Sequence, residues 1–381
     1  MSFIEKLLNG ISVEWKPLEE FADYEQPTRY LVNSKNYSDN FKTPVLTAGK
    51  TFILGYTDET DGINIASENP VIIFDDFTTA NKWVDFDFKA KSSAMKMITS
   101  KDESRASLKY IFYWMNTLPN ELVDGDHKRQ WISNYSKKLI PIPCPDNPKK
   151  SLEIQQKIVA ILDSFTELTA ELKAELKARK MQYIYYREQL LSFKEGEVDF
   201  VELQNLAENL DSMRKPVTSG LRDAGEIPYY GASGIVDYVK DFIFDGDFLL
   251  VSEDGANLLA RNTPIAFSIS GKSWVNNHAH VLKFNTYAER RFVEYYLNSI
   301  DLTPYISGAA QPKLNQRNLN SIKIPNPSLV EKIKIVTILD KFDTLTNSII
   351  DGLPKEIELR KKQYEYYRDL LLAFPKDNLK I

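Results

Sequence analysis

Residues 158–169 read IVAILDSFTELT, and residues 335–346 read IVTILDKFDTLT, so one amphipathic segment occurs twice in the chain. A second pair follows in the same order, RKMQYIYYREQLLSF at 179–193 and RKKQYEYYRDLLLAF at 360–374. Two matched blocks in the same order indicate an internal duplication. The chain should therefore contain two similar halves.

Weaker repeats extend the duplication beyond these helical blocks. They pair VEWKPLEEF from Val13 with VDFVELQNL from Val198, PVLTAGK from Pro44 with PYYGASG from Pro228, YIFYWMN ending at Asn116 with FVEYYLN ending at Asn298, and IPIP at 140–143 with IKIP at 322–325. The order is globular half, helix, globular half, helix. We expect domains at 1–150 and 195–330, a central spacer helix at 151–194 and a distal spacer helix at 331–381.

The helical blocks carry apolar residues at the 4-3 spacing of a coiled-coil seam. In the first copy the seam runs through Ile154, Ile158, Ile161, Phe165, Leu168, Leu172, Leu176, Tyr183, Tyr186, Leu190 and Phe193. In the second copy it runs through Ile335, Ile338, Phe342, Leu345, Ile349, Ile357, Tyr364, Tyr367, Leu371 and Phe374. Because neither helix can hide such a stripe alone, we expect the two to pair antiparallel. Gly352 and Pro354 predict a kink or break near 351–354.

The globular halves read as mixed α/β domains, so the predicted fold class is α+β. Short apolar or alternating runs, VIIF at 71–74, FLLV at 248–251 and HAHVLKF at 278–284, are typical of strands. One helix should end each half, near 104–117 and 287–300.

Composition limits the cellular setting of the chain. No uninterrupted apolar stretch approaches 18 residues, so no membrane span is predicted. The first residues, MSFIEKLLNGISVEW, lack the basic and apolar regions of a signal peptide. A single cysteine, Cys144, excludes an internal disulfide and favours a cytoplasmic location.

Several motifs together resemble the specificity subunit of type I restriction-modification enzymes over essentially the whole chain. They are the paired ILDxFxxLT and RKxQYxYYRxxLLxF blocks, YYGASGIVDY at 229–238, SWVNNHAHVL at 273–282 and SGAAQPKLN at 307–315. TAEL-KAEL at 169–176 is similar to the type IC subgroup, in which the number of such units sets the spacing between half-sites.

The resemblance implies that each globular half is a target-recognition domain that reads one half of a split, asymmetric site in double-stranded DNA. It also implies that the helices dock two modification subunits, which methylate adenine with S-adenosylmethionine. Restriction/translocase subunits, which use ATP and Mg, would complete the complex. No cofactor is expected in this chain.

The net charge of −5 is unusual for a DNA-binding protein. Neither globular half has more basic than acidic residues, although neutralised phosphates supply much of non-specific DNA affinity. Either the chain does not bind DNA, or partners contribute the positive charge; the resemblance favours the second reading. The alternative is a scaffold whose two domains bind proteins across a coiled-coil spacer.

Polar loops supply the candidate DNA contacts, because base edges are read by Arg, Lys, Asn, Gln and hydroxyl side chains. In the first half these are Thr78, Thr79, Asn81, Lys82, Lys89, Lys91, Ser92, Ser93 and Lys96. In the second half they are Tyr230, Ser233, Asn257, Arg261, Asn262, Lys272, Ser273, Asn276, Asn277, Gln311 and Lys313. For any one of these residues, a solvated polar loop is the simpler interpretation.

Tyrosines and arginines that fall off the seam are candidates for binding the partner subunits, since both types anchor interfaces. They are Arg179, Tyr185, Arg187, Arg360, Tyr366 and Arg368. We expect no catalytic residue, because NPVIIF at 69–74 and NTPIAF at 262–267 both lack the full Asn-Pro-Pro-aromatic motif of a methyltransferase. No metal site is expected either: His278 and His280 lack a third ligand and read as ordinary strand residues.

Overall fold

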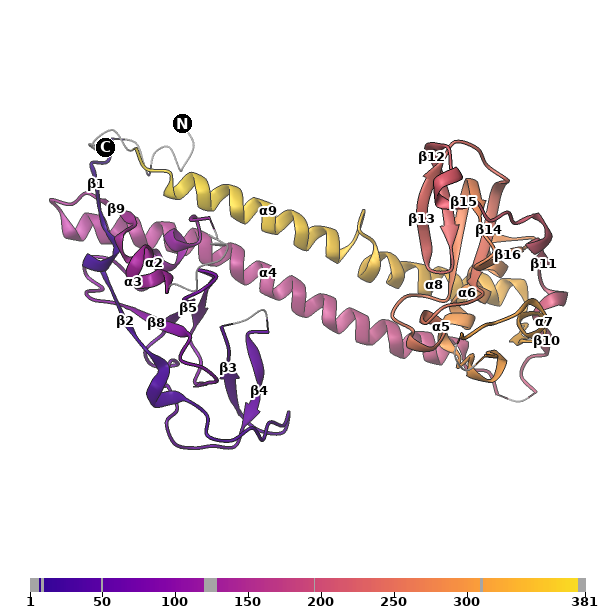
Figure 1. Cartoon of the computed structure of the whole chain (residues 1–381), viewed down its shortest axis with the longest axis horizontal. Coiled ribbons are helices and arrows are strands. Elements are labelled where there is room, and N and C mark those ends of the chain that lie inside the picture. The colour runs from indigo at the N-terminus through magenta and orange to yellow at the C-terminus, as the bar shows by residue number, and fades with distance from the viewer. Residues whose placement is uncertain are drawn as a thin grey trace. The chain divides into compact units, whose positions relative to one another are not determined.

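The computed structural model describes residue 7 and residues 10–48, 51–119, 129–194, 196–308 and 311–375 (Figure 1). Its contacts divide the chain into two compact units. The first unit comprises Met1–Leu172 and Ile357–Ile381, and the second comprises Lys173–Glu356. Each unit therefore combines one globular half with parts of the helices. No helix among the described residues is long and apolar enough to cross a membrane.

The first unit is built on two sheets. A four-stranded sheet has the order β2 (Ala22–Glu25), β8 (Met95–Ser100), β5 (Val71–Asp75) and β6 (Asn81–Val84). A three-stranded sheet has the order β4 (Ile53–Thr57), β3 (Thr43–Leu46) and β7 (Lys89–Ala90). Every residue of β5 is buried, as its continuous apolar run predicts. Helix α2 (Leu108–Met115) begins after Ser107, whose side chain accepts a hydrogen bond from the Tyr110 amide, and α3 (Gln130–Ser133) follows.

The second unit contains a six-stranded sheet. Its order is β11 (Glu208–Asn209), β16 (Ala279–Lys283), β14 (Phe244–Ser252), β15 (Ala266–Val275), β12 (Ala224–Gly231) and β13 (Gly234–Val239). Helices α5 (Asn257–Ala260), α6 (Tyr287–Ser299) and α7 (Gln316–Asn320) complete the globular part (Figure 1). The predicted strands at 71–74, 248–251 and 278–284 and the two predicted terminal helices are all present, with ends shifted by a few residues.

A small sheet closes each globular part, and it confirms the duplication. In the first unit β1 (Val13–Pro17) pairs antiparallel with β9 (Leu139–Pro143), and in the second β10 (Phe200–Glu202) pairs antiparallel with β17 (Lys323–Pro325). A buried leucine follows the first strand in both units. The Leu18 amide donates to the Lys138 carbonyl at 2.9 Å, and the Leu203 amide donates to the Ile322 carbonyl at 3.0 Å.

The weaker repeat also corresponds to shared topology. The hairpin β3–β4 of the first unit and the hairpin β12–β13 of the second each make one parallel pairing, Val45 opposite Lys89 and Tyr229 opposite Trp274. Sequence similarity between PVLTAGK and PYYGASG thus marks equivalent strands.

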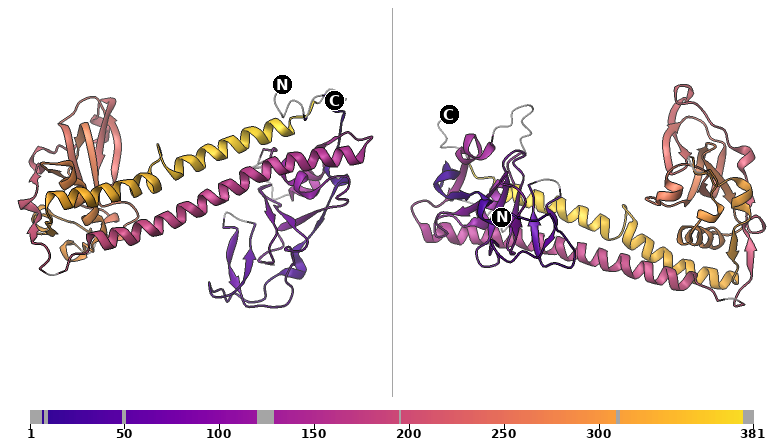
Figure 2. Two further views of the ribbon diagram at one scale, coloured as in Figure 1. Left: turned by 180° about the vertical axis from the view of Figure 1, so that it is seen from behind. Right: turned by 60° about the horizontal axis from the view of Figure 1, so that its bottom comes forward.

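Helix α4 (Pro148–Leu191) is continuous, and the distal segment forms α8 (Leu329–Asn347) and α9 (Leu353–Leu372). Within the first unit Phe165 of α4 stacks on Tyr367 of α9, with ring centroids 5.3 Å apart. Within the second unit Tyr186 of α4 stacks on Phe342 of α8 at 5.6 Å. Tyr186 comes later in α4 than Phe165, but its partner Phe342 comes earlier in the distal segment than Tyr367. The helices therefore run antiparallel, as predicted. Both views in Figure 2 show α9 alongside the first part of α4.

The distal segment, predicted over 331–381 with a kink or break near 351–354, forms two helices separated at residues 348–352. Gly352 adopts φ +94°, and a Cβ there would lie 2.3 Å from the Thr344 carbonyl oxygen. The break begins a few residues before the predicted 351–354. Ile349, predicted in the seam, is therefore 79% exposed.

The seam prediction is also incomplete, because each helix buries a second face. Leu162 and Leu339 are fully buried, although neither belongs to the predicted stripe. They join the apolar clusters of the globular parts, which include residues of α2 and α6 respectively. By contrast, Ile338 of the predicted stripe is 40% exposed. A two-sided helix does not satisfy one heptad pattern.

Candidate nucleic-acid interface

In the first unit six of the predicted DNA contacts are accessible and three are buried. The accessible residues are Thr78, Asn81, Lys82, Lys91, Ser92 and Ser93. The prediction for Thr79, Lys89 and Lys96 is wrong, because all three are buried within the unit. Thr79 has a left-handed backbone, with φ 59°, inside the turn after β5.

Lys89 is buried because it ties two loops to the three-stranded sheet. Its ammonium lies 2.9 Å from a Glu59 carboxylate oxygen and donates to the Asp61 carbonyl oxygen at 2.6 Å. The hydrogen bond from Lys89, together with backbone amides, holds the pKa of Glu59 below its ordinary value. Glu59 itself accepts from the amides of Asn33 and Ser34. Lys89 is thus a structural residue.

Lys96 belongs to β8 of the four-stranded sheet, and its side chain is fully buried. Its ammonium lies 3.6 Å from a carboxylate oxygen of Asp76 and 4.8 Å from the ring centroid of Tyr24. Burial lowers the pKa of Lys96 below its ordinary value; the charge of Arg129 acts in the same direction and that of Asp76 opposes it. A base contact from this side chain would require the sheet to open.

In the second unit nine predicted contacts are at least partly accessible and two are buried. The accessible residues are Tyr230, Ser233, Asn257, Arg261, Asn262, Lys272, Asn277, Gln311 and Lys313. The prediction for Ser273 and Asn276 is wrong, because both are buried. Asn276 accepts a hydrogen bond from the His278 amide at 2.8 Å and so shapes the turn between β15 and β16. Ala309 and Ala310 of the SGAAQPKLN motif lie outside the described residues.

Among the accessible residues, Asn257 and Arg261 have their polar groups engaged around α5. The Asn257 side chain bonds both the amide and the carbonyl of Thr263, at 3.0 Å each. Arg261 has a left-handed backbone and donates to the Ile300 carbonyl, and burial lowers the pKa of its guanidinium. These residues close the α5 loop, and Asn262 and Thr263 beside them are exposed.

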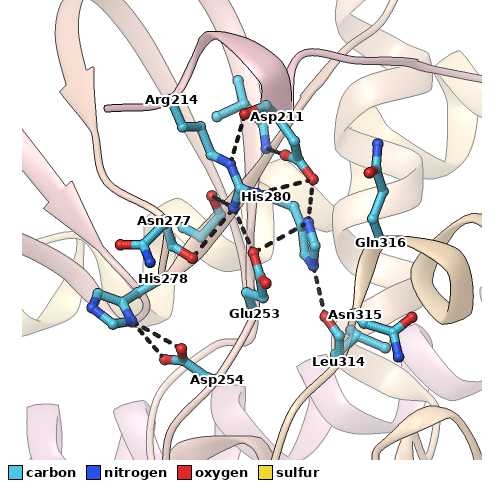
Figure 3. Close-up of polar contacts among 12 residues, drawn as sticks. Asp211, Arg214, Glu253, Asp254, Asn277, His278, His280, Leu314, Asn315 and Gln316 are labelled. Carbon is cyan, nitrogen blue, oxygen red and sulfur yellow. Dashed lines mark hydrogen bonds and ion pairs between the residues drawn. The ribbon is translucent and has the colours of Figure 1, made fainter. Parts of the chain in front are cut away.

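A buried cluster around His280 is the feature that sequence reasoning missed (Figure 3). His280 has no exposed surface. Its Nδ1 lies 2.6 Å from an Asp211 carboxylate oxygen, and its Nε2 lies 2.7 Å from the Leu314 carbonyl oxygen. The Leu314 carbonyl oxygen can only accept, and the Asp211 carboxylate, whose pKa is lowered, also accepts, so both ring nitrogens donate. The geometry therefore assigns an imidazolium cation at this position.

Two carboxylates and one guanidinium complete the buried part of the cluster. Arg214 lies 2.6 Å from Glu253 and 3.4 Å from Asp211. Burial alone would raise the pKa of Asp211, but the hydrogen bond and charge of His280 outweigh it, so that the pKa is lowered. The pKa of Glu253 is also lowered, because Arg214, His280 and Lys313 outweigh burial. Buried charges are thereby paired, as they must be.

Lys313, Gln316 and His278 are exposed at the rim of the cluster and could meet a base edge or a phosphate; Figure 3 labels the last two. Lys313 lies 3.1 Å from Glu253 with half of its side chain exposed. The Gln316 amide donates to Asn209 at 2.9 Å. His278, 51% exposed at its side chain, pairs with Asp254 at 2.9 Å. Of these, only Lys313 was predicted. The His-x-His motif was visible, but His278 lies in a turn and not in the strand, so the two rings do not share a strand face.

Metal binding finds no support in the part of the chain that the structure describes. No group of three or more His, Cys, Asp or Glu side chains is placed there to hold a metal ion.

The candidate subunit contacts lie at equivalent places on α4 and α9. Tyr185 and Tyr366 are 58% and 63% exposed, and each meets the neighbouring tyrosine edge-on at 75°. Arg179 and Arg360 bond the glutamine three residues later, and Arg187 and Arg368 lie over the ring four residues earlier. The two copies thus offer the same surface twice. Partner binding there stays a prediction.

Duplicated mixed α/β domains on antiparallel helices define a class of two-domain proteins with helical connectors, and comparisons with known proteins identify the family. Residues 12–179 and 195–359 each match the family described as "Type I restriction modification DNA specificity domain". The chain is 52% identical to the type I restriction enzyme EcoR124I/EcoR124II specificity subunit of Escherichia coli, over 99% of this chain and 98% of that protein.

A second relative and a solved structure agree with this family. The type I restriction enzyme EcoprrI specificity subunit of Escherichia coli is 32% identical over 92% of each chain. The crystal structure of the S subunit of a type I restriction-modification system from M. genitalium has the same fold, with a TM-score of 0.65 and 17% identity over 99% of this chain and all of that one. The chain therefore belongs to the type I restriction-modification DNA specificity family, and it is a specificity subunit without a catalytic role of its own.

Proposed function

We propose that this chain reads a bipartite, asymmetric DNA sequence and directs methyltransferase and nuclease subunits to it. The observation that supports this most strongly is the match of both halves, separately, to a DNA specificity domain. Each half has its own sheet and its own accessible polar side chains, so each can read its own half-site. Linking two readers makes the second binding event intramolecular, and modest contacts at each half-site then combine.

The proposed partners are double-stranded DNA, two modification subunits and the restriction/translocase subunits. The repeated surface supports two copies of the modification subunit, because Tyr185 and Tyr366 have similar exposure, 58% and 63%, and equivalent tyrosine neighbours. We propose that S-adenosylmethionine is bound by the modification subunit, that ATP and Mg are bound by the nuclease subunit, and that this chain binds neither. Such a complex would act on DNA in the cytoplasm.

Methylome sequencing tests the proposal. The chain is expressed with its methyltransferase partner in cells that lack other adenine methylation. We expect methylated adenines in one split sequence, with two defined half-sites and a fixed gap. Omitting the chain should abolish the methylation. Methylation that persists without the chain, or that lacks a split sequence, would contradict the proposal and favour a protein-binding scaffold.

A further inference from the structure

We propose that the buried cation beside the central strand of each unit is a positioning residue for DNA reading, supplied by Lys96 in the first unit and by His280 in the second. This inference rests on the proposed function. Lys96 and His280 are different residue types, and the sequence repeat does not align them. They nevertheless occupy the same position relative to the strands of their units.

Strand register establishes the equivalence. In the first unit β5 pairs with β8, and Phe74 lies opposite Lys96. In the second unit β14 pairs with β16, and Val251 lies opposite His280. Two residues after each opposing position comes a carboxylate, Asp76 in one unit and Glu253 in the other. The distance from the cationic nitrogen to the carboxylate is 3.6 Å for Lys96 and 3.8 Å for His280.

The outer strand supplies an acceptor to each cation. Tyr24 of β2 lies opposite Ile98, and Asn209 of β11 lies opposite Leu282. Two residues further along come Gln26 and Asp211 respectively. With the Gln26 amide oriented so that its oxygen faces the donors, it accepts from Lys96 at 3.0 Å, and Asp211 accepts from His280 at 2.6 Å.

Each cluster also fastens the segment that leads into a short helix. In the first unit the amide of Gln130, the first residue of α3, donates to the Asp76 carbonyl oxygen at 2.9 Å. In the second the Leu314 amide donates to the Glu253 carbonyl oxygen at 2.8 Å, just before α7. A basic residue precedes each of these amides. Arg129 donates to Gln26 at 2.9 Å, and Lys313 lies 3.1 Å from Glu253.

A buried ion pair rarely makes a protein more stable than well-packed apolar residues would. Its presence in both units therefore indicates a role other than stability. In the second unit the imidazolium bonds the Leu314 carbonyl oxygen, and the exposed side chains of Lys313 and Gln316 stand on either side of that residue. Recognition side chains need a rigid second layer that fixes their position. The His280 cation, on strand β16, bonds the Leu314 carbonyl oxygen and thereby fixes the position of the exposed side chains of Lys313 and Gln316.

Leucine substitutions test the role through specificity at each half-site. His280→Leu and Lys96→Leu are each expressed with the methyltransferase partner, and the methylome is sequenced. We expect each variant to lose about tenfold discrimination at one or more bases of one half-site, with the other half-site unchanged. The two variants should affect different half-sites. Relaxation of the same half-site by both, or of neither, overturns the inference while leaving the proposed function intact.

Two further variants separate positioning from general destabilisation. His280→Lys places the first unit's cation in the second unit and should keep wild-type specificity. Leu297→Ala removes fully buried apolar volume from α6 in the same unit and should lower methylation without relaxing the sequence. If His280→Leu abolishes methylation altogether, His280→Lys decides: retained specificity supports the inference, and its loss overturns it. Relaxation by Leu297→Ala overturns it as well.

Discussion

Asp211 holds three of the contacts that keep the His280 cluster together, and its ionisation should be visible in stability. It accepts from the His280 ring and from the Val281 amide, and it lies near Arg214. Its folded-state pKa is lowered, so its contribution is present above the unfolded pKa of about 3.9 and is lost as the pH falls through the lower folded value.

We therefore expect Asp211→Asn to destabilise the chain by about 3 kcal/mol at pH 7, since it leaves a buried cation without its partner. The difference from wild type should shrink as the pH falls below about 4. Thermal unfolding of both proteins across this range measures it. A difference that stays constant down to pH 3 would show that the carboxylate charge is not what stabilises the cluster.

Lys82 is the most accessible lysine among the first unit's candidates that lie in a strand, and its ammonium lies 4.4 Å from the Phe52 ring centroid. If it contacts a phosphate, Lys82→Ala should weaken DNA binding by the assembled complex about equally for all sequences and reduce the salt slope by about 1. Lys177→Ala, an exposed lysine of α4, is the control. Salt titrations of DNA affinity compare them, and equal behaviour of the two variants would exclude the contact.

Residue types in the recognition loops could be predicted, but burial could not. Lys89, Lys91 and Lys96 belong to one hydrophilic run, and only Lys91 has an accessible side chain. Their partners come from elsewhere in the sequence: Glu59 lies in a loop about thirty residues before Lys89, and Asp76 lies in the turn after β5. The His280 cluster joins segments near residues 211, 253, 280 and 314 for the same reason. Local patterns do not encode contacts of this kind.

At the level of helices and strands, the repeat made most of the fold predictable. Paired helical blocks and the strands β5, β14 and β16 follow from apolar periodicity alone. The end of α8 does not, because Ile349 and Ile350 continue an apolar pattern beyond Asn347, where the helix stops. Gly352 determines that stop through a backbone conformation that side chains disfavour.

Gly352→Ala should destabilise the joint between α8 and α9 by about 1–3 kcal/mol, because φ is +94° and the added Cβ would meet the Thr344 carbonyl oxygen. Thermal unfolding measures the change. Gly220→Ala is the control, since nothing lies within 4 Å of its Cβ position and its φ is not positive. Equal melting temperatures for the two variants would contradict the strain argument.

Deleting Lys173–Leu176 should change the gap between the half-sites and leave both half-site sequences as they are. The deletion removes about one turn from α4, the continuous helix that leads from one unit into the other. Lys173, Ala174 and Glu175 are exposed and Leu176 is only half-buried, so the deletion takes little from either core. Methylome sequencing of cells that carry the deletion reads the gap directly, and an unchanged gap would refute the spacer role of α4.

For the whole molecule, net charge predicts dependence on partners. At −5 the chain cannot supply a strong general attraction to phosphates, so we expect weak DNA binding by the chain alone and specific binding once the methyltransferase is added. Fluorescence anisotropy with one labelled duplex, at fixed salt, compares the two states. Tight specific binding by the chain alone would contradict the expectation.

The small sheets β1–β9 and β10–β17 bring the two ends of each globular part together, with Val13 opposite Pro143 and Phe200 opposite Pro325. Residues between these ends that do not pack on the long helices can vary while the ends stay hydrogen-bonded to each other. A different recognition domain inserted between the same two strands would be connected to the long helices by the same small sheet. New sequence preferences could thus arise by exchanging one whole module, with the remaining half-site inherited unchanged.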